Sequence, residues 1–366
     1  MTTISFPTID EATRRRMLAP PVGDEPVRVI IDTDAANEID DQFALAWALL
    51  SQDRLEIEGV CAEPFSFAIH REELQRTQAI IQRGGPRDAR EARLVERLGP
   101  WLRGLEAAGI PLTEIHHFEP PDVGMERSYE EVLCIYDKLG LDAQGLAFRG
   151  SPGYLPSPAE PVPSPAAEHI IECARRESDR PLYIAAMGCL TNVASALLMA
   201  PEIIRNMVVL WTAGFGSESS RPNDDSFNLI QDLAATRVIF DCGVPLVYLP
   251  GFHIGAQLRL SLPEMETWVQ GRGAIGDYLY WLYTHNPIRQ QRGVSGHFGR
   301  TWIIWDLIDI AWLLNPAWVP TELRPTPVLD DDLIWRQAPG RPPMREAYDI
   351  DRDGIFRDLL GKLGNI

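Results

Sequence analysis

Short apolar runs rich in β-branched residues alternate along the chain with stretches in which apolar residues recur at helical spacing. Residues 27–32, VRVIID, form one such run and predict a buried strand. From Asp40 the apolar positions follow the period of a helix, with two acidic residues in its first turn. Residues 55–62, LEIEGVCA, predict a second strand. This strand–helix–strand unit implies two parallel strands joined by a right-handed crossover.

The same alternation continues through the second half of the chain. The pattern predicts helices at 166–176, 191–201 and 232–243 and strands at 181–188, 206–214 and 244–252. Alternating strands and helices are typical of a sheet covered on both faces. We therefore expect an α/β fold with a mainly parallel central sheet, Rossmann-like in layout, in one domain spanning residues 1–366.

Four segments depart from this pattern. Residues 68–122 hold charged amphipathic helices and predict an α-helical insertion. Ser128 and Glu131 have the spacing of a capping box, which predicts that a helix begins at Ser128. Residues 148–165 are rich in Pro, Gly and Ser and predict a loop. Residues 262–316 are helical and aromatic, and we expect this region near the active site.

Composition narrows the classes of function. The chain has 366 residues, 45% of them hydrophobic, and a formal net charge of −18, which disfavours binding to a nucleic-acid backbone. No apolar run approaches the length of a membrane span, and the N-terminal segment lacks the apolar core of a secretory signal. Five scattered cysteines fit a reducing compartment. We expect a cytoplasmic protein that binds a metal ion or a small neutral or cationic ligand.

The predicted first strand is followed by four aspartates within ten positions, Asp32, Asp34, Asp40 and Asp41. Ligands of open α/β sheets bind at the carboxyl ends of the strands, and grouped carboxylates suit a hard cation such as Ca²⁺ or Mg²⁺. Helix capping and solvated turn residues would explain one or two of these acids, but not four. An Asp-x-Asp phosphatase of the haloacid dehalogenase kind would explain only the first pair. A second acidic run at 349–354 begins like a calcium loop but lacks the closing glutamate.

Four segments, in order, resemble the inosine/uridine-preferring nucleoside hydrolase family. The stretch DTDAANEIDD at 32–41 resembles the family motif D-x-D-P-G-x-D-D, and GCLTN at 188–192 resembles G-x-L-T-N. The stretch SFN at 226–228 resembles E-F-N, and WD at 305–306 resembles the C-terminal H-D. These segments extend over most of the chain outside the insertion and the N-terminal tail.

The resemblance implies Ca²⁺-dependent hydrolysis of the N-glycosidic bond of a small ribosyl substrate by a homodimer or homotetramer. It makes Asp34 both a metal ligand and the general base acting on the attacking water. The other implied metal ligands are Asp41, Asp306 and the backbone carbonyl of Met187. Asp40 and Asn228 would bind ribose hydroxyls, and Asp32 would be a supporting acid.

The sequence also departs from the family pattern. Five residues, Ala35 to Ile39, separate the second and third aspartates, where the motif has three. Glu63 stands where an asparagine is common and is expected to face the sugar, although a solvated loop acid is an equal alternative. Ser226 replaces the glutamate of E-F-N, and Trp305 replaces a histidine that can protonate the leaving base. Trp305 can instead stack on a flat leaving group. Protonation of the leaving base would then fall to another residue, with Tyr280, Tyr283, His285 and His297 as candidates, or be unnecessary for a good leaving group.

Two alternatives to hydrolysis stay open. The replacements at Ser226 and Trp305 are compatible with a catalytically weak protein that binds a nucleoside or another ribosyl compound. The phosphatase is the weaker alternative, because it leaves the three later segments unexplained.

Overall fold

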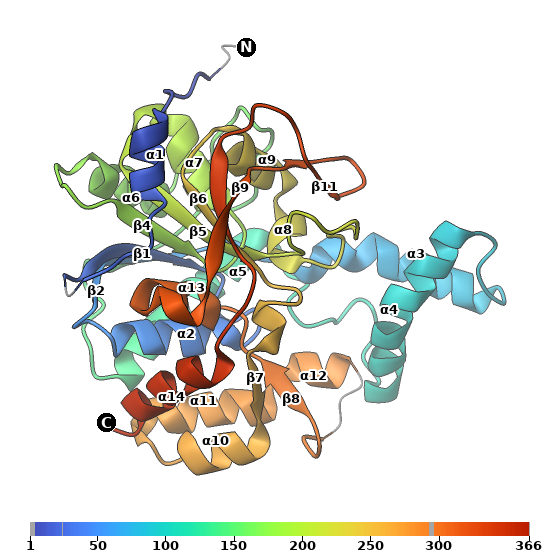
Figure 1. Ribbon diagram of the computed structural model, residues 1–366. Coiled ribbons are helices and arrows are strands. Elements are labelled where there is room, and N and C mark those ends of the chain that lie inside the picture. The colour runs from blue at the N-terminus through green and yellow to red at the C-terminus, as the bar shows by residue number, and fades with distance from the viewer. Residues whose placement is uncertain (1–3, 24, 293–295, 366) are drawn as a thin grey trace.

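The computed structural model describes residues 4–23, 25–292 and 296–365. Its centre is an eight-stranded sheet with the order β3-β2-β1-β4-β5-β6-β12-β9 (Figure 1). The strands are β1 (Val27–Thr33), β2 (Leu55–Ala62), β3 (Ala147–Phe148), β4 (Leu182–Ala186), β5 (Met207–Ala213), β6 (Leu246–Pro250), β9 (Thr321–Pro325) and β12 (Pro343–Ala347). All neighbours pair in parallel except β9, which runs antiparallel to β12. The predicted α/β class with a mainly parallel sheet is confirmed.

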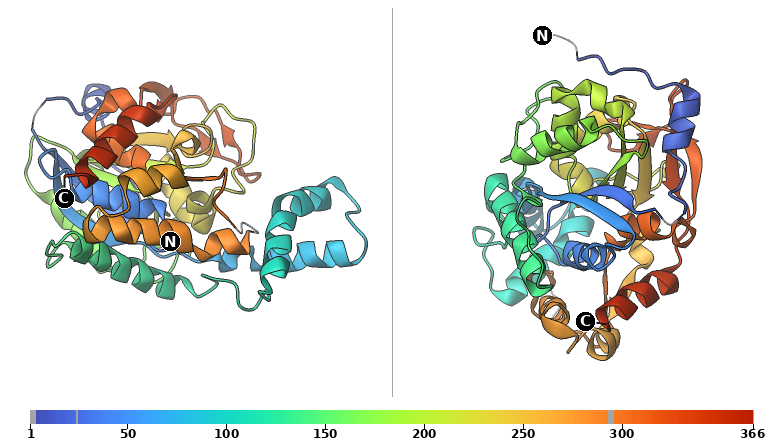
Figure 2. Two further views of the ribbon diagram at one scale, coloured as in Figure 1. Left: turned by 90° about the horizontal axis from the view of Figure 1, so that it is seen from below. Right: turned by 90° about the vertical axis from the view of Figure 1, so that its left-hand side faces the viewer.

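Helices cover both faces of the sheet (Figure 2). One face carries α6 (Pro165–Arg175), α7 (Thr191–Met199) and α9 (Leu233–Asp241), and the other carries α2 (Asp40–Leu49), α5 (Pro121–Lys138) and α13 (Leu307–Leu314). The side chains of β1 alternate between the two cores: Val29 and Ile31 pack on the α2 face, and Ile30 packs on the α6 face. Because both faces are covered, every residue of β1 is buried.

The remaining elements lie around this frame. They are α1 (Glu11–Met17), η1 (Phe67–His70), α3 (Arg71–Gln82), α4 (Ala89–Ala108), η2 (Pro201–Arg205), α8 (Phe227–Gln231), η3 (Gly255–Gln257), β7 (Arg259–Ser261), α10 (Leu262–Trp268), α11 (Gly273–His285), α12 (Pro287–Gln291), β8 (Thr301–Ile303), η4 (Pro316–Trp318), β10 (Val328–Leu329), β11 (Trp335–Arg336) and α14 (Arg352–Leu363). Helices α3 and α4 project from the body as a helical arm (Figure 1). None of the helices in the described ranges is long and apolar enough to cross a membrane.

The expectation that a helix begins at Ser128 was wrong. Helix α5 begins at Pro121, and Ser128 lies inside it rather than at its cap. Proline is favoured in the first turn of a helix, and the Ser128 hydroxyl donates instead to the carbonyl of Thr33 at 3.0 Å. This bond attaches α5 to the carboxyl end of β1.

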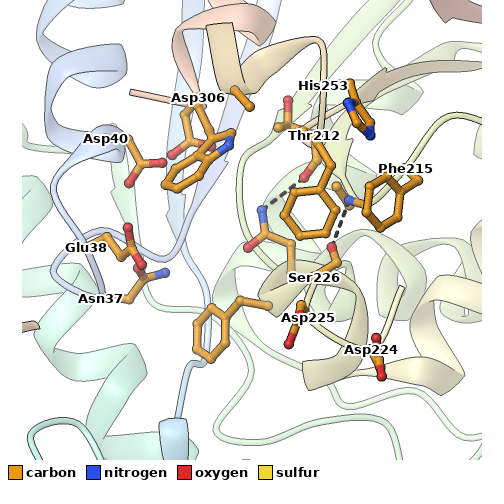
Figure 3. Close-up of a pocket in the computed structure, with 18 of the residues that line it drawn as sticks. Asn37, Glu38, Asp40, Thr212, Phe215, Asp224, Asp225, Ser226, His253 and Asp306 are labelled. Atoms are coloured by element: carbon orange, nitrogen blue, oxygen red, sulfur yellow. Dashed lines mark hydrogen bonds between the residues drawn. The ribbon is translucent and has the colours of Figure 1, made fainter. Parts of the chain in front are cut away.

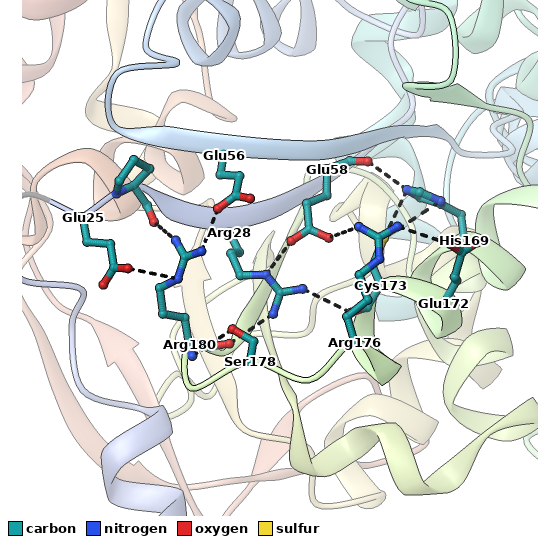
Figure 4. Close-up of polar contacts among 11 residues, drawn as sticks. Glu25, Arg28, Glu56, Glu58, His169, Glu172, Cys173, Arg176, Ser178 and Arg180 are labelled. Carbon is teal, nitrogen blue, oxygen red and sulfur yellow. Dashed lines mark hydrogen bonds and ion pairs between the residues drawn. The ribbon is translucent and has the colours of Figure 1, made fainter.

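A network of ion pairs and hydrogen bonds lies at the opposite end of the sheet, near the amino-terminal ends of β1 and β2 (Figure 4). Arg28 of β1 pairs with Glu58 of β2 at 2.5 Å, and both side chains are almost fully buried. Arg176 also reaches Glu58, at 3.1 Å, and Arg180 pairs with Glu56 at 2.9 Å. These pairs neutralise charge where the strands begin, whereas the aspartates lie where β1 ends.

Candidate active site

The aspartates converge at the carboxyl end of β1. Asp34 follows this strand, and Asp40 and Asp41 form the first turn of α2, where the helix dipole favours negative charge. Asp306 precedes the first residue of α13 and comes from the far end of the chain. Single carboxylate oxygens of Asp40, Asp41 and Asp306 lie within 4.8 Å of one another. The structure thus places three carboxylates around one point.

These carboxylates are buried without cationic partners. Asp34, Asp40, Asp41 and Asp306 are each at most 6% exposed, and within the described ranges none forms an ion pair with Lys or Arg. Burial raises the pKa of Asp34 to about 7, which the amides of Gln231 and Asn37 oppose. Burial, followed by repulsion among the acids, raises the pKa values of the other three well above their ordinary range. A cation at this point would reverse those shifts, so the donor set fits a hard metal ion.

The carboxylates form one side of a pocket of about 850 Å³. Figure 3 shows Asp40, Asp306 and Glu38 facing Phe215 and His253 across it. Six aromatic residues also line the pocket, Phe67, Trp101, Phe215, Phe227, Phe252 and Trp305, together with the charged or polar residues His70, Arg97, Arg221, Asp224, Asp225, His253, Arg259 and Arg292. Clustered carboxylates and flat aromatic faces in one pocket suit a ligand with a hydroxyl-rich part and an aromatic part.

The expected metal-binding carbonyl and sugar-binding amide contact each other. Asn228 of α8 lines the pocket and donates through Nδ2 to the carbonyl oxygens of Met187, at 2.6 Å, and Thr212, at 3.0 Å. The Met187 carbonyl keeps a second lone pair. Because Nδ2 is engaged, the amide oxygen of Asn228 is the atom left to face a ligand.

The two replaced motif residues have clear structural positions. The Ser226 hydroxyl accepts from the backbone N–H of Gly214 at 2.8 Å, so it holds the pocket wall rather than pointing freely into it (Figure 3). Trp305 lines the pocket, and its indole Nε1 has no hydrogen-bond partner among the described residues. A Cβ at Gly255 would approach Trp305 Cδ1 to 3.3 Å, so the backbone packs closely against the indole.

The aromatic region from 262 to 316, of which 293–295 lie outside the described residues, brings Trp305 and Asp306 to the site. The pocket lining within the described ranges does not include its four candidate proton donors, Tyr280, Tyr283, His285 and His297. Tyr283 is buried and donates to the carbonyl of Leu260 at 2.9 Å. The histidines that do line the pocket are His70 and His253.

Glu63 and Asp32 lie behind the pocket rather than in its lining. Both are fully buried, and Asp32 accepts from Asn192 Nδ2 at 2.9 Å. A Cβ at Gly188 would lie 2.6 Å from the Asp34 side chain and 2.7 Å from Glu63 Oε2, so only glycine fits between them. The structure therefore does not bring Glu63 to the expected sugar contact.

Sequence reasoning missed two contributors to the site. Gln231, at the end of α8, donates through Nε2 to Asp34 Oδ2 at 3.2 Å. From the helical arm, Trp101 and Arg97 line the pocket. Arg97 pairs with Glu73 at 2.6 Å and donates to the Asp224 carbonyl at 2.9 Å, which ties α4 to the opposite wall. No short motif marks either contributor, because both contacts depend on long-range packing.

Comparisons with known proteins agree with the fold and identify a family. The family model described as inosine-uridine preferring nucleoside hydrolase matches residues 29–356. The pyrimidine-specific ribonucleoside hydrolase RihA of Shewanella sp. (strain ANA-3) is 28% identical over 222 residues, covering 56% of this chain and 68% of that protein. The non-specific ribonucleoside hydrolase RihC of Salmonella newport (strain SL254) is 31% identical over 139 residues, covering 37% and 42%. A solved purine-preferring ribonucleoside hydrolase from Gardnerella vaginalis shares the fold, with a TM-score of 0.60, 16% identity and coverage of 92% and 98%.

Proposed function

Because the chain belongs to the inosine-uridine preferring nucleoside hydrolase family, we propose that it hydrolyses the N-glycosidic bond of a ribonucleoside or a related ribosyl compound, releasing ribose and base. The observation that carries the proposal is the cluster of three buried carboxylates, Asp40, Asp41 and Asp306, in a pocket that Asp34 and several aromatic residues also line. Acids of this kind stabilise the positive charge that develops on the sugar during glycoside cleavage. The aromatic faces suit the departing base.

The proposed resident cation is Ca²⁺, held by Asp34, Asp41, Asp306 and the Met187 carbonyl. Asp40 lies within 4.8 Å of Asp41 and Asp306, whereas Asp34 is not in that group of three. We assign Asp40 to a ribose hydroxyl because it begins α2 at the pocket wall. A bound divalent cation would lower the pKa of a water molecule and help to anchor vicinal hydroxyls.

The side chains around the proposed cation have separate roles in the reaction. Asp34 takes the proton of the attacking water through Oδ1, the oxygen without a partner among the described residues. Asp40 and Asn228 hold the ribose hydroxyls and so fix the sugar with respect to Asp34. Trp305 stacks on the leaving base and excludes water from that side of the pocket.

A reducing-sugar assay on purine, pyrimidine and modified ribonucleosides, run with Ca²⁺ and with a chelator, tests the proposal. We expect chelator-sensitive ribose release from at least one compound, and Asp34→Ala should lower kcat by at least about a thousandfold. Tight nucleoside binding without ribose release would instead favour the weakly catalytic binding protein. Mg²⁺-dependent phosphate release from common phosphoesters would favour the phosphatase. The cytoplasmic location and the dimer or tetramer stay predictions.

A further inference from the structure

One glutamine side chain joins the proposed general base to two segments distant in sequence. Gln231 is 4% exposed and is the last residue of α8, whose N-cap is the pocket residue Ser226. We propose that Gln231 sets the orientation of the Asp34 carboxylate and that Tyr154 in turn fixes Gln231. This inference rests on the proposed role of Asp34 as base and metal ligand. Gln231 and Tyr154 are then positioning residues, since each acts through another group.

The hydrogen bonds determine which way the Gln231 amide points. Its Oε1 accepts from the backbone N–H of Ser66 at 3.2 Å and from the Tyr154 hydroxyl at 2.9 Å. An amide nitrogen cannot accept from the Ser66 N–H, so the opposite orientation would lose that bond and would turn Oε1 towards the Asp34 carboxylate; the Tyr154 hydroxyl, which can donate or accept, holds either end. The Nε2 is therefore directed to Asp34 Oδ2, at 3.2 Å. The amide can only donate to the carboxylate.

This bond distinguishes the two oxygens of Asp34. Oδ2 is held by Gln231, whereas Oδ1 is buried and has no hydrogen-bond partner within the described ranges. Rotation about the terminal torsion of aspartate is soft, so the carboxylate plane would otherwise be weakly defined. With Oδ2 fixed, Oδ1 is the oxygen presented to the cation and the water.

The loop that supplies Tyr154 is itself attached at the neighbouring residue. Asp232 accepts from the backbone N–H of Leu155 at 2.9 Å and from the Thr191 hydroxyl at 2.7 Å. Adjacent residues of the loop therefore contact adjacent residues at the end of α8. The hydrogen bond from the Leu155 N–H to Asp232 therefore fixes the backbone beside Tyr154, so that the Tyr154 hydroxyl lies next to Gln231.

Three variants test the chain of contacts. Gln231→Met keeps the side-chain length and removes the amide, and we expect kcat to fall about 10- to 100-fold with KM changed less than about threefold. Tyr154→Phe should lower kcat by a few-fold, because the Ser66 N–H still holds Oε1. The double variant should be no slower than Gln231→Met, since Tyr154 acts through Gln231. Gln52→Met, in the turn after α2 and exposed, is the matched control and should leave kcat unchanged.

Calorimetric Ca²⁺ affinity gives a readout independent of turnover. Gln231→Met should weaken Ca²⁺ binding about tenfold, and Gln52→Met should not. Wild-type kcat and Ca²⁺ affinity in Gln231→Met would overturn the inference, and an additive loss in the double variant would overturn the part assigned to Tyr154. If Gln231→Met does not fold, Tyr154→Phe becomes the test. An unchanged kcat and an unchanged Ca²⁺ affinity in that variant would refute the proposed contacts from Tyr154 through Gln231 to Asp34. If the wild type releases no sugar, the proposed function fails, while the affinity measurement still judges the role of Gln231.

Discussion

Trp305 occupies a position where a histidine would offer a proton, and it offers a flat apolar face instead. We expect Trp305→Ala to raise KM for a nucleoside with an aromatic base about 5- to 10-fold, the loss of one stacking contact, with a smaller rise for Trp305→Phe. Steady-state kinetics on the preferred nucleoside measure this. The control is Trp281→Ala, because Trp281 is an exposed residue of α11 that does not line the pocket. An unchanged KM in Trp305→Ala would show that the indole does not contact the base.

His117 provides a prediction about pH. Its side chain is 4% exposed, and burial, followed by the nearby His116 and Arg127, lowers its pKa to about 3. Below pH 6.5 the unfolded chain gains a proton here that the folded chain does not, so the free energy of unfolding falls as pH falls from 6.5 towards 3. The loss is at most about 1.4 kcal/mol per pH unit.

His117→Asn should reduce this dependence, and asparagine tolerates the φ of 62° at this position. Urea unfolding at pH 7.5 and pH 5.5 should show the wild type losing about 1 kcal/mol more than the variant. Equal losses would mean that His117 is protonated in the folded protein.

The sequence predicted that the aspartates of the site lie together, because residues that follow one strand closely must lie at the same end of the sheet. Glu63 was harder to place, because one step along a loop decides whether a side chain faces the pocket or the space behind it. Gln231 carried no local signal. Its contact with Asp34 requires α8 and the loop at 148–165 to be in their final positions.

At the scale of elements, the apolar runs located the central strands well, because strands buried on both faces are apolar at every position. The start of α5 was misplaced because Ser128 and Glu131 fit a capping box by chance. Glu131 accepts instead from the Tyr278 hydroxyl at 2.7 Å. Only the packing of α5 on β1 and α11 distinguishes a helix that begins at Ser128 from one that begins at Pro121.

The helical arm contributes to the pocket through α4. Arg97→Gln removes the bonds that join α4 to the 224–225 segment, so we expect KM to rise a few-fold with kcat little changed. Arg93→Gln, one turn earlier on the same helix and exposed, should change neither constant. A fall in kcat at constant KM would indicate that the arm acts on the chemical step instead.

For the whole molecule, the proposed cation should stabilise the fold, because its proposed ligands come from the first strand–helix unit, from Met187 after β4 and from Asp306 before α13. Thermal unfolding with Ca²⁺ at a hundred times its dissociation constant should show a gain of about 2.7 kcal/mol over the chelated protein. Asp306→Asn should lose most of this gain. Asp349→Asn, in the acidic run near the C-terminus, should keep it. A full gain in Asp306→Asn would place the ion elsewhere.

The distance in sequence between Asp34 and Asp306 also has a consequence for synthesis on the ribosome. The segment that carries Asp34, directly after β1, is made early, but Asp306 is added only after β2, β4, β5 and β6 have been translated. A nascent chain that has not reached Asp306 can pair its first strands without being able to assemble the proposed catalytic centre. We therefore expect translation products that are truncated before Asp306 neither to hydrolyse the substrate nor to retain the ion.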